Sequence, residues 1–174
     1  MKSWVLIGAL LVFLCLPGIV RFTPAQTDRP NAAAQHLKTI TLRIGKATLQ
    51  TEVAVTREET ARGLGFRSRL DDNAGMIFVL PVERATFWMK DCLIPLSVAF
   101  LDKDGVILEI HDMMQPDPAK MADDASLPLT HSDSDQVAFA IETNLHWFAL
   151  NGIKPGVKVE PPVKTLRPKL QIGQ

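Results

Sequence analysis

The stretch LSVAFLDKDGVILEI at residues 96–110 decides the fold class. Two apolar runs, residues 96–101 and 106–110, flank the tetrapeptide DKDG at residues 102–105. Asp-Gly between two apolar runs is a strong hairpin signal, because glycine adopts the positive φ that the tightest β-turns require. We therefore predict two antiparallel strands joined by a short turn.

Upstream of this hairpin, the sequence predicts a second pair of strands. Ile40, Leu42 and Ile44 alternate with polar residues, which is the pattern of a strand with one buried face. A Gly-Lys turn at residues 45–46 leads into another alternating segment at residues 49–55. The β-rich character of the chain therefore extends toward its N-terminal side.

A short helix is predicted immediately after these strands. Thr56 and Glu59 have the spacing of a capping box, in which a hydroxyl and a carboxylate bind the free amides of the first helical turn. Gly63 is placed to end the helix. We expect the helix to cover residues 57–62.

The rest of the chain adds strands and one more helix. Apolar or alternating runs predict strands at residues 76–80, 85–89, 137–142 and 157–160. Residues 115–135 predict a long polar loop, and a short helix is expected at residues 145–150, between Asn144 as its cap and Gly152 as its end. The predicted fold class is mainly β: a compact antiparallel β-sandwich or squat barrel with two short helices.

Residues 1–25 have the order of a secretory signal peptide. Lys2 precedes an apolar run at residues 4–16, and small residues at 23–25 offer a cleavage site. A membrane span needs about 20 apolar residues, so a signal peptide is favoured, and a retained anchor formed by residues 4–20 is the alternative. In both cases we expect the rest of the chain to be exported, either periplasmic or membrane-anchored and facing the periplasm.

The remaining chain divides into a linker at residues 26–37, one β-rich domain at residues 38–160 and an extended tail at residues 161–174. Nineteen basic and nineteen acidic residues cancel, so the chain has no electrostatic signal for nucleic acid. Two cysteines exclude a disulfide-dense scaffold and a four-cysteine zinc site. Because no zinc, phosphate-loop or dinucleotide motif is present, we expect no metal and no cofactor.

Four ordered blocks resemble a known family. They are RGLGFR at residues 62–67, GMIF at 75–78, FWMK at 87–90, and IPL at 94–96 followed by Phe100. Together they resemble the widespread bacterial and archaeal family named domain of unknown function 192, over about residues 38–160. The resemblance implies a compact β-rich fold and frequent export, with no assigned biochemical role.

Three positions depart from the pattern of that family. Gly65 stands where the family usually has Met, and Asp91-Cys92 stands where it usually has Asn-Thr. Ser97 occupies a position where the family commonly has Asp. If the Thr and the Asp serve a family ligand, this chain has altered that site.

Trp88 and Lys90 are the first candidate ligand-binding residues. Strand geometry places them on one face, opposite Phe87 and Met89. An aromatic surface beside a cation can stack a sugar ring or hold an anionic group. The alternative is that Trp88 seals the second side of a sandwich while the Lys90 ammonium group reaches water.

Arg62 and Arg67, with Arg69 nearby, surround a turn that contains glycine. Guanidinium groups bind carboxylates and phosphates through two parallel hydrogen bonds, which favours a small anion pocket. The alternative is structural, with these arginines tying the turn to Asp71, Asp72 or strand carbonyls.

A catalytic alternative uses Cys92 as a nucleophile and His111 as its base, with Asp91 or Asp112 as the orienting acid. This chemistry requires the thiolate within hydrogen-bond reach of the imidazole. The acidic segment that holds His131, Asp133 and Asp135 is interpreted as a solvated loop, because it lacks the glycine and terminal glutamate of the common calcium-binding loop.

The leading hypothesis is an exported, non-catalytic β-domain that binds a small ligand or an envelope protein partner through Arg62, Arg67, Trp88 and Lys90. The alternative is a cell-envelope hydrolase that uses Cys92 or carboxylates. We expect no nucleic-acid partner, and membrane contact only if residues 4–20 remain as an anchor.

Overall fold

The computed structural model describes residues 33–116 and 127–166. The predicted signal segment at residues 1–25 lies outside these ranges. In the described ranges, the elements follow the chain as β1 (Thr39–Ile44), β2 (Ala47–Ala54), α1 (Arg57–Arg62), β3 (Ala74–Glu83), β4 (Thr86–Trp88), β5 (Leu96–Leu101), β6 (Ile107–Met113), β7 (Leu129–His131), β8 (Val137–Asn144), α2 (Trp147–Leu150), β9 (Val159–Glu160) and the 3₁₀ turn η3 (Val163–Leu166). The mainly β class with two short α-helices is confirmed.

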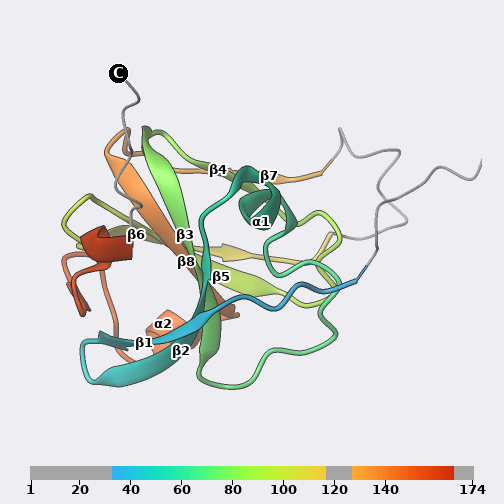
Figure 1. Cartoon of the computed structure of the whole chain (residues 1–174), viewed down its shortest axis with the longest axis horizontal. Helices are drawn as coiled ribbons and strands as arrows, with labels where there is room; N and C mark the ends of the chain where they lie inside the picture. The colour runs from blue at the N-terminus through green and yellow to red at the C-terminus, as the bar shows by residue number, and fades with distance from the viewer. Residues whose placement is uncertain (1–32, 117–126, 167–174) are drawn as a thin grey trace, which may run out of the picture. The chain divides into compact units, whose positions relative to one another are not determined.

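One curled sheet carries most of the strands (Figure 1). Its seven strands lie in the order β6-β5-β8-β3-β2-β1-β9, and β4 pairs with β7 in a separate two-stranded sheet. The predicted hairpin at residues 96–110 forms the β5–β6 pair, in which Leu96 lies opposite Met113. Figure 1 shows α1 beside β4 and β7, at the same end of the sheet.

The pairing of β2 with β3 is parallel, which is an exception to the antiparallel architecture predicted from the sequence. Parallel neighbours need a crossover of a dozen or more residues, commonly with a helix. The connection between Ala54 and Ala74 contains α1 and is long enough to make that crossover. The crossover is what brings α1 to the sheet.

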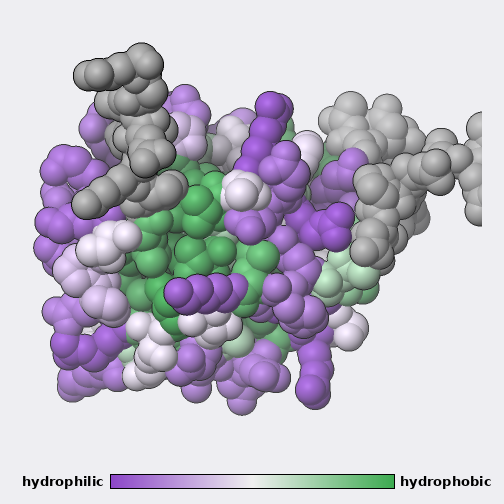
Figure 2. Space-filling view, in the orientation of Figure 1, coloured by the Kyte–Doolittle hydropathy of each residue, from purple (hydrophilic) through white to green (hydrophobic). Residues whose placement is uncertain are grey.

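The central strands are buried on both faces. On one face, Ile77 and Ile141 belong to a core cluster that also contains Trp147 and Phe148. On the other face, Phe78 and Phe100 belong to a second cluster, against which Phe87 of β4 packs. On the face of the molecule seen in Figure 2, apolar side chains gather at the centre and polar side chains surround them.

Three local expectations differ from the structure. The predicted loop at residues 115–135 contains the short strand β7, which pairs with β4. Helix α2 begins at Trp147 after His146, whose φ is 64°, because the Asn144 side chain instead donates hydrogen bonds to the carbonyls of Leu70 and Asp71. The tail expected to be extended contains the turn η3.

Within residues 33–116 and 127–166, no helix has the length and apolar character of a membrane span.

Candidate functional site

A cavity of about 230 Å³ lies between α1, β3, β4 and β8. It brings together sequence-predicted residues from two separate blocks, Arg62 on one side and Trp88, Lys90 and Cys92 on the other. The remaining lining residues are Arg57, Thr60, Ala61, Gly63, Leu64, Phe78, Leu80, Thr86, Phe87 and Glu142.

The capping box fixes where α1 starts. Thr56 Oγ1 accepts a hydrogen bond from the Glu59 amide at 3.2 Å, and the Glu59 carboxylate accepts one from the Thr56 amide at 2.9 Å. The amide bonds from Thr56 and Val55 lower the pKa of Glu59 below its ordinary value. Gly63 ends the helix at a φ of 49°, and a side chain there would begin 3.5 Å from the Phe78 ring and 3.8 Å from the Glu142 carboxyl group. Gly63 therefore lies directly against the interior of the cavity.

The turn after α1 is joined to the turn after β4. Phe66 and Asp91 both have positive φ, and the Phe66 amide donates to the Asp91 carbonyl at 2.8 Å. A Cβ atom on Gly65 would lie 2.9 Å from the Arg62 carbonyl oxygen, which is closer than packing allows. The structure thus leaves no room for the Met that the resembled family usually has at this position.

Glu142 lies on the floor of the cavity. It belongs to β8, and its residue surface is only 4% exposed. Among residues 33–116 and 127–166, its carboxyl group has no hydrogen-bond or ion-pair partner. Burial raises the pKa of Glu142 to about 8, so at neutral pH the group is mostly the uncharged acid.

Trp88 lies at the open side of the cavity and is 45% exposed. The Lys90 Nζ atom lies 5.8 Å from the centre of the indole ring, within the range of a cation–π contact. The neighbouring Phe87 is half-buried and packs edge-on against Phe78 and Phe100, with ring centres 5.1 and 5.6 Å away. Trp88 therefore does not seal a second layer of the core.

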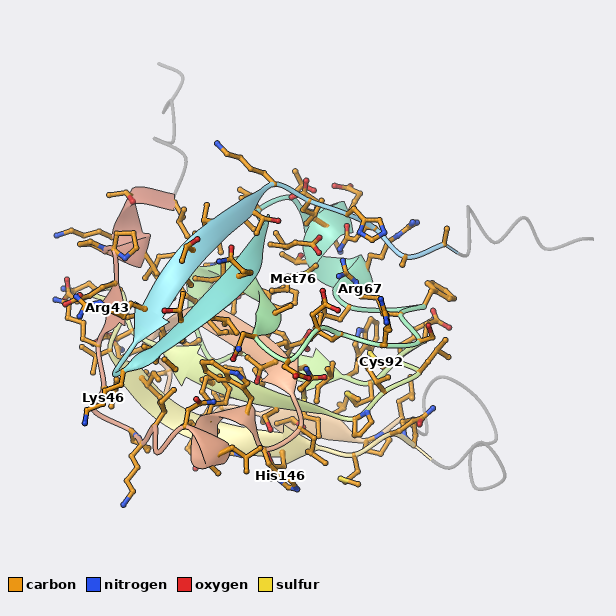
Figure 3. The ribbon with its side chains drawn as sticks, turned by 90° about the horizontal axis from the view of Figure 1, so that it is seen from below. Arg43, Lys46, Arg67, Met76, Cys92 and His146 are labelled. Atoms are coloured by element: carbon orange, nitrogen blue, oxygen red, sulfur yellow. The ribbon has the colours of Figure 1, made fainter. Side chains whose placement is uncertain are left out.

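The two predicted arginines lie in different surroundings. Arg62 lines the cavity and donates from Nη1 to the Ala33 carbonyl at 3.2 Å. Arg67 lies outside the cavity lining and makes a half-buried ion pair with Glu52, with 2.8 Å between Nη1 and Oε1. Its Nη2 donates to the Gln35 carbonyl at 2.5 Å. Figure 3 shows Arg67 and Cys92 toward one end of the sheet and Arg43 toward the other.

The structure does not bring Cys92 and His111 together. Cys92 lines the cavity, whereas His111 lies on β6, where its Nε2 atom bonds Glu109 at 2.7 Å and its ring packs against Phe100. Burial, then the nearby Glu142 and Asp91 carboxylates, raise the pKa of the Cys92 thiol to about 12. A thiol in that state is a poor nucleophile.

The acidic segment serves a structural purpose where the structure describes it. The Glu109 carboxylate accepts hydrogen bonds from the amides of Asp133 and Ser134, at 3.0 and 3.2 Å. Burial opposes ionisation of Glu109, but these amides and His111 outweigh it and lower its pKa. The described residues contain no group of three or more side chains that could hold a metal ion.

Sequence reasoning missed Glu142. The signal was present, since Glu142 follows the run VAFAI and completes a strand that is apolar at every earlier position. Strands buried on both faces are nearly continuous apolar runs, so a carboxylate inside one needs an explanation.

Comparison with known proteins identifies the family. Residues 40–161 match domain of unknown function 192, described as "Uncharacterized ACR". The chain belongs to this family. Among solved structures, a protein of unknown function from Novosphingobium aromaticivorans DSM 12444 is 31% identical, with a TM-score of 0.62 over 75% of this chain and 94% of that one.

A second solved structure shares the fold of this family member. A Sinorhizobium meliloti 1021 protein described as a "putative transcription regulator" superposes with a TM-score of 0.63, over 72% of this chain and 95% of that one. Its sequence identity is 24%, which supports similarity of fold alone. No curated protein matches the sequence.

Proposed function

We propose that this family member is a non-catalytic domain that binds a small molecule in the cavity between α1 and β4. The observation that carries the proposal is Glu142, a residue only 4% exposed whose carboxyl group borders the cavity and has no protein partner among the described residues. Buried polar groups are nearly always hydrogen-bonded, and leaving one unpaired costs about 1–3 kcal/mol. A bound ligand would supply the missing partner.

The walls of the cavity support the same proposal. Ligand sites are concave, mostly apolar and fitted with a few polar groups that fix orientation. Here Phe78, Phe87 and Leu64 supply apolar surface, while Glu142 and Lys90 supply polar groups. The cavity volume of about 230 Å³ is below the roughly 300–1,000 Å³ of drug-sized sites, which favours a small ligand.

The test is a ligand screen on the full-length protein. The Trp88 indole N–H signal in an NMR spectrum, assigned with Trp88→Phe, reports occupancy of the cavity. A true ligand should shift this signal and raise the melting temperature by about 4 °C or more at saturation. Trp88→Ala should weaken binding, whereas Leu129→Ala, on the partner strand and 51% exposed, should not.

Two results would count against the binding proposal. One is a screen in which compounds stabilise wild type and Trp88→Ala equally. The other is native mass spectrometry of protein from its own host that retains no small molecule, combined with a screen that leaves the Trp88 signal unmoved.

Export to the periplasm is part of the proposed function and is supported by the sequence. Lys2, the apolar run at residues 4–16 and the small residues at 23–25 have the order of a signal peptide. N-terminal sequencing of the native protein should begin near Gln26. A native N-terminus at Met1 or Lys2 would exclude cleavage, and recovery in the cytoplasmic fraction would exclude export.

A further inference from the structure

Charge in the cavity is ordered by depth. Glu142 on the floor is almost fully buried, whereas Lys90 and Arg62 are half-buried and Arg57 is exposed. All four side chains line the same cavity. A ligand that enters from solvent therefore passes cations first and meets the acid last.

The floor favours a positively charged group. An ammonium nitrogen placed against Glu142 forms charge-assisted hydrogen bonds, which are about twice as strong as neutral ones. Because Glu142 is almost fully buried, this attraction is stronger there than in water. Phe78, Phe87 and Trp88 also line the cavity, and aromatic faces attract cations.

The outer part of the cavity favours a negatively charged group. Arg62 presents a planar guanidinium group and Lys90 an ammonium group, both suited to a carboxylate or a phosphate. A ligand that carries only positive charge would make no hydrogen bond to these two donor groups. A ligand that carries only negative charge would leave the Glu142 carboxyl group without a partner.

We infer that the ligand is an amphoteric small molecule, with a cationic nitrogen against Glu142 and an anionic group against Lys90 and Arg62. This inference rests on the proposed function and adds the chemical class of the ligand. The volume of about 230 Å³ limits the molecule to a short one, such as an amino acid whose amino and acid groups are a few carbons apart.

Proton release on binding distinguishes a ligand with a cationic nitrogen from a neutral one. Glu142 has a pKa of about 8, so a cationic ligand must displace its proton at pH 7. Binding should release about one proton, whereas a neutral sugar should release none. The other charged or titratable groups that line the cavity are Arg57 and Arg62 at α1, and Lys90 and Cys92 after β4. Cys92 stays protonated at pH 7 because its pKa is about 12.

The experiment is titration calorimetry of the full-length protein at pH 7, in two buffers of different ionisation enthalpy. The probes are ω-amino acids from 3-aminopropanoate to 6-aminohexanoate, with pentanoate and pentylamine as single-charge controls. The best amino acid should bind at least about tenfold more tightly than either control, which is about 1.4 kcal/mol. It should release about one proton.

Three variants assign the two ends of the ligand. Glu142→Gln should lower the affinity for the amino acid about tenfold and abolish proton release on binding. It should leave the affinity for pentanoate unchanged. Lys90→Met should lower the affinity for the amino acid and for pentanoate but not the affinity for pentylamine. Lys46→Met, in the exposed β1–β2 turn, should change none of these affinities.

The possible results distinguish a wrong ligand class from a failure of the binding proposal itself. The inferred ligand class is wrong if pentanoate binds as tightly as the amino acids. It is also wrong if native mass spectrometry finds a neutral sugar or a purely anionic ligand. In both cases the proposal that the cavity binds a small molecule is retained. A retained amphoteric molecule would support the class even if no probe in the series binds. If no probe binds and the native protein retains no molecule, both proposals fail.

Discussion

The Glu142 carboxyl group and the Cys92 thiol line one cavity, where burial raises the pKa of the thiol most and the charge of ionised Glu142 raises it further. Cys92 comes from the turn after β4 and Glu142 from strand β8 of the seven-stranded sheet, so the relationship exists only in the folded protein. Each group is also partly or fully shielded from water, which opposes ionisation of both. The pair is therefore suited to holding protons rather than to nucleophilic attack.

Slow thiol alkylation is the first consequence. With a pKa of about 12, Cys92 has a thiolate fraction of about 10⁻⁴ at pH 8, whereas an ordinary thiol of pKa about 8.5 has roughly a quarter. We expect iodoacetamide to modify Cys92 at least about 100-fold more slowly than free cysteine, as measured by peptide mass spectrometry. Modification after unfolding in urea is the control. A native rate equal to that of free cysteine would restore the hydrolase hypothesis.

The buried acid makes stability depend on pH. The pKa of Glu142 is about 8 in the folded protein and 4.5 as its ordinary value, so the folded state binds more protons than the unfolded state between these values. The free energy of unfolding should therefore fall as pH rises from about 5 to 8, by up to about 1.4 kcal/mol per pH unit from this group. Urea titrations at several pH values measure the slope. Glu142→Gln should flatten it, and equal slopes in both proteins would contradict the assignment.

Arg67 should matter for stability rather than for binding. Its ion pair with Glu52 is 10% exposed on the arginine side and 14% on the glutamate side, and Glu52 also accepts the Leu37 amide at 2.6 Å. Arg67→Ala leaves that carboxylate half-buried without its cation, which we expect to cost about 3 kcal/mol of unfolding free energy. Arg62→Ala is the matched variant and should cost less than about 1 kcal/mol. Similar costs for the two variants would contradict these roles.

Trp88 and Phe87 are adjacent residues with opposite surroundings. Trp88 is 45% exposed, whereas Phe87 packs against Phe78 and Phe100. Phe87→Ala should cost about 3 kcal/mol or more because it opens a cavity among these rings. Trp88→Ala should cost less than about 1.5 kcal/mol. Denaturant unfolding of the two variants decides the point, and a larger loss for Trp88→Ala would make the indole part of the core.

Local features of this fold could be predicted from sequence because neighbouring residues determine them. The Asp104-Gly105 turn and the Thr56–Glu59 capping box both form as expected. The exposed face of Trp88 also follows from strand alternation. Each of these depends on residues a few positions apart.

The site could be predicted only in part, because its remaining features depend on contacts between distant segments. The parallel pairing of β2 with β3 follows from how the chain crosses over the sheet. Glu142 lies close to Gly63, which belongs to the distant segment that ends α1. Arg62 and Arg67 looked equivalent in sequence, but in the structure Arg67 pairs with Glu52 while Arg62 lines the cavity.

Ser97 offers the last prediction, because the resembled family commonly has Asp at this position. The Ser97 hydroxyl donates to Asp112 Oδ1 at 2.5 Å and accepts the His146 amide at 2.8 Å, and His146 Nδ1 bonds Asp112 Oδ2 at 2.8 Å. Ser97 is fully buried and lies opposite Asp112 in the β5–β6 pair. Ser97→Asp would place two carboxylates side by side, and we expect it to cost at least about 2 kcal/mol of unfolding free energy at pH 7.

Exchanging the two residues should remove most of that cost. The double variant Ser97→Asp with Asp112→Ser retains one carboxylate and one hydroxyl across the strand pair, so it should recover more than half of the loss. Ser97→Ala is the control for the lost hydroxyl alone and should cost about 1–3 kcal/mol, because the His146 amide loses its acceptor. The Ser97→Asp penalty should also shrink near pH 4, where one carboxylate takes up a proton. Urea unfolding of the three variants at pH 7 and pH 4 tests the argument. If the double variant is no more stable than Ser97→Asp, or the penalty is the same at both pH values, repulsion from Asp112 is not what disfavours a carboxylate at this position.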